Sequence, residues 1–252
     1  MTAAVQPCVA GIVFALPIEA DAFERRIAGR REWRGPGPAF HEGTIAGGRV
    51  AWCVSGVGGP AAARATNLLI DGHRPRAIVS AGFAGGLDAA LARGAVVRPT
   101  AVVTEAAGGR IPLAALDDPQ GGPLLVSVAE VAGTVARKRD LAARTGAGVV
   151  DMETQAVATA AAAAGLPCHC VRVISDDAAQ ALPPEAMALA RPQSTARRFS
   201  AVLGALGRRP AVAVDLWRLY EHAVVDGRTL AAALEALCAA LAAAATAGRP
   251  EA

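Results

Sequence analysis

The chain has 252 residues, of which 53% are hydrophobic, and its 25 basic residues exceed its 22 acidic ones by only three. So small an excess, with 4% aromatic residues and no RNA- or DNA-binding motif, argues against a nucleic-acid partner. Five cysteines, an odd number scattered through apolar runs, argue against a disulfide framework and favour reduced thiols in the cytoplasm.

The first predicted elements are a strand and a helix. Residues 8–15 form an unbroken apolar run, typical of a buried strand. Pro17 suits the first turn of a helix, and Glu19 follows it closely. Residues 41–46 and 49–55 then predict a hairpin with Gly47-Gly48 as its turn.

Three later strands end in glycines or acids. Residues 77–80 precede a predicted glycine-rich turn at residues 81–86, where another molecule can approach the backbone. Asp151 and Glu153 follow one apolar run, and Asp176 ends another. A helix at residues 154–164 joins these two runs, which predicts a βαβ unit. If the strands are parallel, Glu19, the glycines at residues 82–86, Glu153 and Asp176 converge on one cleft, at the edge of an α/β sheet where ligands bind.

Some residues have a plainer interpretation as structure. Glu19 can be a helix-start residue, Asp176 an N-cap and Met152 core filler. The run Arg137-Lys138-Arg139 predicts the solvated face of a helix. In Cys168-His169-Cys170, strand alternation puts the cysteines on one face and the histidine on the other, and no second ligand pair exists, so no metal site is expected.

Five motifs, taken together and in order, resemble the purine nucleoside phosphorylase and methylthioadenosine/S-adenosylhomocysteine nucleosidase superfamily. They are GIVFALPIE at 11–19, SGVG at 55–58, AGFAGGL at 81–87, VDME at 150–153 and VRVISD at 171–176. One fragment alone is a weak signal, but five in the family's order are a strong one.

The resemblance implies a three-layer α/β fold in which helices flank a central mixed, mostly parallel sheet. It implies one domain over residues 1–252, with a core at about 8–180 and a helical C-terminal extension at about 181–248. Because relatives are usually oligomers, it also implies a homo-oligomer, acting on a small-molecule nucleoside without a cofactor.

The reaction that the resemblance implies is cleavage of the bond between a purine and C1′ of its ribose. Glu19 matches the acid that positions and deprotonates the attacking water. Asp176 matches the residue that gives a proton or a strong hydrogen bond to the purine N7. Because a free carboxyl group is ionised at neutral pH, the site must keep the proton on Asp176 or share it with the substrate.

Other positions match the family's substrate contacts. Met152 would pack on the ribose, and the acceptor-only carboxylate of Glu153 would suit its 2′ and 3′ hydroxyl groups. Arg172 would orient the water or pair with a carboxylate, and Ser175 would orient Asp176. The implied substrate-binding set is Gly82, Phe83, Ala84, Val131, Met152, Glu153, Arg172 and Ser175.

The choice between hydrolysis and phosphorolysis depends on departures from the family pattern. Phosphorylases hold the phosphate dianion with an arginine just before the glycine-rich segment and a serine within it. Here Ser80 lies near the first place and Phe83, which cannot donate a hydrogen bond, occupies the second. Arg25, Arg26 or Arg64 could still reach the site, but the pattern favours water.

The segment from residue 181 onward resembles the branch of the superfamily associated with hopanoid biosynthesis. Residues 191–209 hold five arginines and no acid, interleaved with apolar residues at helical spacing. Such a stretch can lie on an anionic membrane surface, so the localisation could extend from the cytoplasm to the inner face of the membrane. A packed helix with a solvated basic face is the favoured alternative.

The sequence therefore predicts a purine nucleosidase that releases adenine from a 5′-substituted adenosine, with adenosylhopane as one candidate. Residues 230–247, mostly alanine around Glu235, predict a packed amphipathic helix rather than a membrane span. The alternatives are a phosphate-dependent phosphorylase, a methylthioadenosine/S-adenosylhomocysteine nucleosidase, and a non-catalytic nucleoside-binding or membrane-associated protein.

Overall fold

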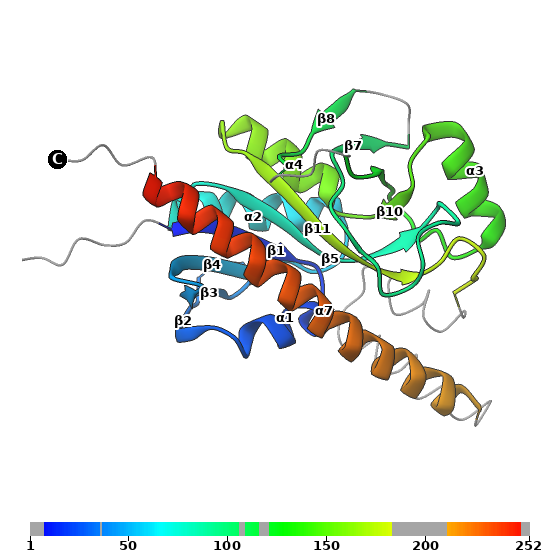
Figure 1. Ribbon diagram of the computed structural model, residues 1–252, viewed down its shortest axis with the longest axis horizontal. Coiled ribbons are helices and arrows are strands. Elements are labelled where there is room, and N and C mark those ends of the chain that lie inside the picture. The colour runs from blue at the N-terminus through cyan, green and yellow to red at the C-terminus, as the bar shows by residue number, and fades with distance from the viewer. Residues whose placement is uncertain (1–7, 36, 106–108, 116–120, 183–210, 248–252) are drawn as a thin grey trace, which may run out of the picture.

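The computed structural model describes residues 8–35, 37–105, 109–115, 121–182 and 211–247, without the side chains of 211–219. Figure 1 shows a central sheet with one layer of helices in front of it and another behind. The predicted α/β architecture, with a mixed sheet between helices and a helical C-terminal segment, is therefore confirmed. The basic stretch at residues 191–209 lies outside the described residues.

Eleven strands form the described sheet. Nine of them follow the order β2-β3-β4-β1-β5-β10-β9-β7-β8, while β11 pairs with β5 and with β6. The strands are β1 (Cys8–Phe14), β2 (Ala28–Trp33), β3 (Phe40–Ile45), β4 (Gly48–Val54), β5 (Ile78–Gly86), β6 (Val96–Val97), β7 (Ala101–Thr104), β8 (Arg110–Pro112), β9 (Leu124–Ser127), β10 (Val149–Asp151) and β11 (Cys168–Asp176).

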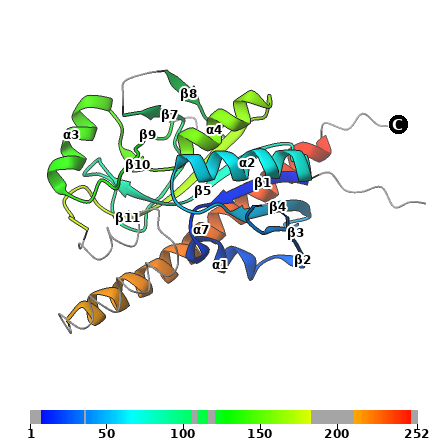
Figure 2. The same cartoon turned by 180° about the vertical axis from the view of Figure 1, so that it is seen from behind.

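Helices cover both faces of the sheet. The described helices are α1 (Pro17–Glu24), α2 (Gly59–His73), α3 (Val135–Thr145), α4 (Thr154–Ala163) and α7 (Ala211–Ala247). One core cluster joins β1 to α1 and α7 through Phe14, Phe23 and Leu234. A second joins the opposite face to α2 and α4 through Leu69 and Val157, and Figure 2 shows these two helices from behind.

The direction of β10 differs from the prediction. Strands β1 and β11 run parallel to β5, but β10 runs antiparallel to it, with Val150 opposite Gly85. The segment β10-α4-β11 is therefore not a parallel βαβ unit. The pairing of β1 with β5 ends where Val13 lies opposite Ser80. Strand β10 pairs with the same edge of β5 at its other end. The two strand ends face each other across residues 81–84, which leaves a gap in the sheet.

The predicted turn at residues 81–86 is wrong, because β5 continues as a strand through Gly86. The glycines instead make room for side chains that cross this strand. A Cβ atom at Gly82 would lie 2.5 Å from Glu19 Oε1, and one at Gly85 would lie 3.3 Å from Asp176 Oδ2. The sequence predicted that another group could come close to the backbone at a turn. In the structure, side chains come close to these glycines within strand β5.

The predicted hairpin is confirmed as β3 and β4, but its turn lies one residue earlier. Ile45 pairs with Gly48, so Ala46 and Gly47 form the turn, and both have positive φ angles, 48° and 78°. Positive φ at both central residues is the geometry that suits a two-residue hairpin.

Helix α7 packs on the sheet along its second half, as predicted for residues 230–247. Leu230, Leu234 and Leu237 are buried against the β1 side of the core. By length and composition alone, residues Tyr220–Ala247 are also sufficient to cross a membrane, although 28% of the most apolar window is buried in the fold. In Figure 1 the opposite end of α7 projects beyond the sheet.

Candidate active site

A cavity of about 220 Å³ lies in the gap between the ends of β1 and β10. Its floor is β5. Its walls come from β10, from the end of β11, and from the segments that follow β1, β4, β9, β10 and β11. The lining residues are Ala15, Leu16, Glu19, Val57, Phe83, Ala84, Gly85, Val128, Val131, Ala132, Val150, Asp151, Met152, Glu153, Ser175, Asp176 and Leu182. The walls are thus mostly apolar, with four carboxyl groups among them.

Glu19 reaches the cavity from the first turn of α1. Its Oε2 accepts hydrogen bonds from the backbone N–H groups of Ala15 (2.9 Å) and Leu16 (2.8 Å), and its Oε1 accepts one from Phe83 (2.8 Å). The helix-start interpretation is therefore correct as well. A carboxylate offers about four acceptor positions, so one on Oε1 stays available for a water molecule.

Burial raises the pKa of Glu19, although the backbone hydrogen bond from Phe83 and the charge of Arg172 work in the opposite direction. The two side chains meet over Gly82, where an added Cβ would lie 3.0 Å from Arg172 Nη1. A carboxylate with a raised pKa has a higher proton affinity, which makes it a stronger base toward water.

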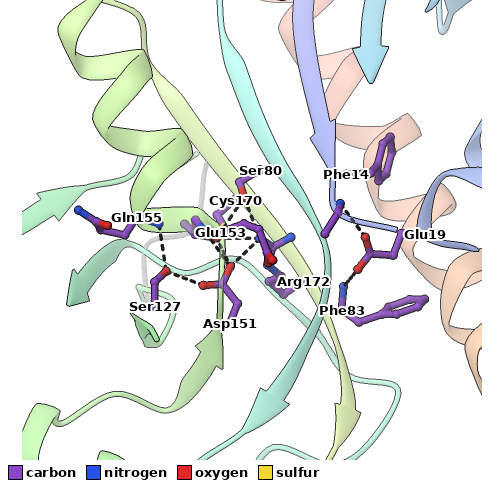
Figure 3. A network of polar contacts seen from close by, with 12 residues as sticks. Phe14, Glu19, Ser80, Phe83, Ser127, Asp151, Glu153, Gln155, Cys170 and Arg172 are labelled. Carbon is purple, nitrogen blue, oxygen red and sulfur yellow. Dashed lines mark hydrogen bonds and ion pairs between the residues drawn. The ribbon is translucent and has the colours of Figure 1, made fainter. Parts of the chain in front are cut away.

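Arg172 lies beneath the cavity rather than in its wall. Its Nη2 contacts Asp151 Oδ2 (2.6 Å), Ser80 Oγ (2.8 Å) and Thr154 Oγ1 (2.8 Å), a network drawn in Figure 3. Burial is the largest single effect and opposes the charge on Arg172, but the negative charges of Asp151, Cys170, Glu19 and Glu153 together outweigh it, and the pKa of the guanidinium is raised. Arg172 was predicted either to orient the water or to pair with a carboxylate. The contact with Asp151 is such a pair.

Asp151 fixes the turn between β10 and α4. Its Oδ1 accepts a hydrogen bond from Ser127 Oγ (2.5 Å), and its Oδ2 accepts one from the backbone N–H of Thr154 (3.0 Å). These bonds hold the residues between them, Met152 and Glu153, at the cavity wall. Asp151 was not among the predicted site residues, and its position directly before the Met-Glu pair was the available signal.

Glu153 stands opposite Glu19. Its Oε1 accepts a hydrogen bond from the backbone N–H of Gly58 at 2.6 Å. Burial, and secondarily the negative charge of Asp151, raise the pKa of Glu153 to about 7. Its second oxygen has no partner among the described residues, so a pair of sugar hydroxyl groups could donate to it.

Asp176 ends β11 over Gly85, and both of its carboxylate oxygens are engaged. Ser175 Oγ lies 2.7 Å from Oδ1, and Lys138 Nζ contacts Oδ2 as an ion pair. The prediction that Lys138 lies on a solvated face is therefore wrong, since the side chain is 1% exposed. Its neighbours Arg137 and Arg139 are half-buried and exposed, respectively.

Sequence reasoning missed Lys138 because it lies within a basic run. The signal that could have found it is helical spacing, since Lys138 is three residues before Leu141 and both point into the core. The residues predicted from the resemblance that line the cavity are Glu19, Phe83, Ala84, Val131, Met152, Glu153, Ser175 and Asp176. Gly82 and Arg172 lie beneath it, and the chemical roles of all ten stay predictions.

The alternative phosphate ligands do not line the cavity. Ser80 is buried and bonded to Arg172, while Arg26 pairs with Glu235 on the far side of α1. Arg25 lies beside Asp21, and Arg64 is exposed on α2. Within the described part of the chain, no arginine or lysine lines the cavity.

Other cavities and side-chain clusters have fewer groups that could act in catalysis. A larger hollow of about 370 Å³ lies between the β3-β4 turn and α7, but apart from Arg49 its lining is uncharged and mostly alanine and glycine. Cys168 and Cys170 belong to the apolar cluster under α4. In the described ranges, no three His, Cys, Asp or Glu side chains are grouped so that they could hold a metal ion.

Comparison with known proteins places the chain in a family. The family model described as the phosphorylase superfamily matches residues 9–130 and 120–209. The chain therefore belongs to the phosphorylase superfamily.

Its similar relatives include nucleosidases. The chain is 36% identical over 88 residues to the 5′-methylthioadenosine/S-adenosylhomocysteine nucleosidase of Colwellia psychrerythraea and 34% identical over 87 residues to that of Tolumonas auensis. These segments cover 35% and 34% of the chain, and 36% and 38% of the relatives' own lengths. The matched part is therefore little more than a third of either relative.

Solved structures agree in fold. The Colwellia psychrerythraea nucleosidase in complex with adenine has a TM-score of 0.62 at 25% identity, over 68% of this chain and 83% of that one. The S-adenosylhomocysteine nucleosidase of Streptococcus pyogenes in complex with 5-methylthiotubericidin has a TM-score of 0.70 at 18% identity, over 95% and 99%. The second likeness concerns the fold alone.

Proposed function

We propose that this protein is a purine nucleosidase that hydrolyses the N-glycosidic bond of a 5′-substituted adenosine and releases adenine. The observation that carries the proposal is the placement of Glu19, Glu153 and Asp176 around one cavity of otherwise mostly apolar character. The reaction needs a base for the water, acceptors for the ribose hydroxyl groups and a proton or hydrogen bond for the purine. In this proposal Glu19, Glu153 and Asp176 supply them in that order.

In this mechanism, water donates a hydrogen bond to the remaining acceptor position of Glu19 and attacks C1′. Glu19 takes one proton from the water as the C1′–O bond forms. The electron pair of the C1′–N9 bond leaves with the base, which becomes neutral by accepting at N7 the proton that Asp176 gives or shares there. Glu153 accepts hydrogen bonds from the ribose hydroxyl groups and so holds C1′ against the water.

Water rather than phosphate is the nucleophile in this proposal. A phosphate dianion needs positive charge and several donors. Phe83 contributes only its backbone N–H, and that group is already bonded to Glu19. The absence of arginine and lysine from the described cavity lining also supports hydrolysis. Phosphorolysis stays the competing reaction within the same fold.

The 5′ substituent is the finer part of the proposal. The relatives' names support methylthioadenosine or S-adenosylhomocysteine, whereas the resemblance of the C-terminal segment to the hopanoid branch supports adenosylhopane. An apolar wall of Val128, Val131 and Leu182 is compatible with an apolar 5′ group. A helix of sufficient length and hydropathy at Tyr220–Ala247 agrees with membrane contact, which would bring a lipid substrate within reach.

Adenine release tests the proposal. The purified protein is incubated with methylthioadenosine, S-adenosylhomocysteine and adenosylhopane, each with and without phosphate. Release that does not depend on phosphate supports the nucleosidase and ranks the 5′ groups. Release only with phosphate would make the product a ribose 1-phosphate and replace hydrolysis by phosphorolysis. No release, together with retained binding of the nucleosides, would favour a non-catalytic binding protein.

A further inference from the structure

Lys138 is a buried ammonium group that the proposed reaction does not use directly. It projects from α3 and contacts Asp176 Oδ2, the backbone carbonyl of Asp177 (2.5 Å) and that of Gln180 (3.0 Å). An ammonium group has three donors, and these three acceptors satisfy all of them. Lys138 is therefore held in one orientation, with one donor assigned to the carboxylate.

A lysine is a costly way to fill this place in the fold. Removal of an ammonium group from water costs several kcal/mol, and an apolar side chain of similar volume is often as stable in its place. The neighbouring buried position on the same face of α3 is Leu141, which packs in an ordinary apolar cluster with Val126 and Val150. The charge of Lys138 thus calls for an explanation other than packing.

The second partner of Asp176 is less firmly fixed. Ser175 Oγ lies 2.7 Å from Asp176 Oδ1 and 3.2 Å from the carbonyl oxygen of Ala84, and its single hydrogen can serve only one of them. Lys138 is therefore the contact that determines where the carboxyl group of Asp176 stands above Gly85.

We infer that Lys138 is the positioning residue of Asp176: its ammonium group holds Oδ2 from behind and so directs the carboxyl group toward the leaving base. This inference rests on the proposed nucleosidase function. It assigns to Lys138 no contact with substrate. The effect of Lys138 on the reaction must therefore depend on Asp176. A lysine that only stabilised the packing of α3 against residues 177–180 would act independently of Asp176.

A double-mutant cycle tests this dependence. The kcat and KM for adenine release from methylthioadenosine are measured for the wild type, Lys138→Met, Asp176→Asn and the double variant. We expect Lys138→Met to lower kcat at least tenfold with a smaller change in KM. The double variant should be no more than about threefold slower than Asp176→Asn alone, because residues that act as a unit are strongly non-additive.

Leu141→Ala is the matched control on the same face of α3. It removes packing without contact to Asp176, so its effect on kcat should multiply with that of Asp176→Asn. Lys138→Arg, which keeps a charged donor, should recover part of the lost kcat. If Lys138→Met does not fold, Lys138→Gln, which keeps donors without the charge, takes its place in the cycle with the same expectation.

Two results would overturn the inference. One is a kcat of the uncharged Lys138 variant within twofold of wild type, and the other is a pair of effects that multiply in the double variant. Both leave the nucleosidase proposal intact, because the wild type is active in each. An inactive wild type, by contrast, would remove the proposed function and this inference together.

Discussion

Gly82 is the residue at which the two sides of the candidate site come closest. Glu19 approaches from α1 and Arg172 from β11, and both lie over the bare Cα of this glycine. Three backbone N–H groups hold the carboxylate of Glu19 in this place.

Gly82→Ala should therefore displace Glu19 and Arg172 from each other. The new Cβ would stand 2.5 Å from Glu19 Oε1 and 2.9 Å from its Cδ, which requires a shift of the carboxyl group. A misplacement of this size costs on the order of 100-fold in kcat/KM for adenine release. The control is Gly72→Ala on the exposed side of α2, where a Cβ would meet nothing within 4 Å. Equal activity of the two variants would contradict the proposed role of Glu19.

Glu153 gives the site a pH dependence. Because its pKa is raised to about 7, it loses its charge as the pH falls through that value, and with it the proposed capacity to accept hydrogen bonds from both ribose hydroxyls. The ratio of kcat/KM for a ribonucleoside to that for its 2′,3′-dideoxy analogue should rise between pH 5 and 8. Contributions of Glu19 cancel in this ratio. A ratio that stays constant over the range would remove Glu153 from the sugar site.

At the scale of elements, the strands were predictable where their composition is decisive. Strands β1 and β11 are both almost completely buried; β1 appears in the sequence as a continuous apolar run, and β11 as an apolar run interrupted by His169 and Arg172. The direction of β10 was not predictable, because a three-residue strand takes its direction from its partners. For Lys138, the helical spacing to Leu141 could have indicated burial, but its pairing with Asp176 arises from tertiary contacts and was not predictable.

The end of α7 that packs on the sheet is the element that closes one face of the fold. Leu234 is fully buried there among Phe14, Phe23 and Trp52, whereas Val225, two turns earlier, is 56% exposed. Leu234→Ala should lower the free energy of unfolding by roughly 2–5 kcal/mol, and Val225→Ala by less than about 0.5 kcal/mol. Urea titration of both variants measures the difference. Equal losses would indicate that α7 leaves the sheet in solution.

For the whole molecule, Glu19 and Glu153 should reduce stability as the pH rises. A carboxyl group whose pKa is higher in the folded than in the unfolded chain binds more protons when folded. Its favourable contribution to the free energy of unfolding is complete below the pKa of the unfolded chain. This contribution is lost as the pH rises through the pKa of the folded chain. The raised pKa values of Glu19 and Glu153 both act in this sense.

Glu153→Gln should therefore be more stable than the wild type at pH 8, by roughly 2–4 kcal/mol if the pKa difference is fully expressed. The carboxamide oxygen can still accept from Gly58, so the main change is loss of the charge. The gain should shrink as the pH falls below about 7 and be nearly gone at pH 4, where the wild-type carboxyl group is mostly neutral in both the folded and the unfolded chain. Thermal unfolding of both proteins at pH 8 and at pH 4 measures this gain. A variant that is less stable than the wild type at pH 8 would contradict the pKa shift.

The three hydrogen bonds to Glu19 tie β1, α1 and β5 to one carboxylate. Each of these amide groups has that carboxylate as its acceptor, so neutralisation of Glu19 weakens all three anchors at once. The protection of the Ala15, Leu16 and Phe83 amides against deuterium exchange should therefore rise and fall together. The proposed reaction requires the same charged carboxylate as its base, so loss of these three anchors and loss of the base would occur together.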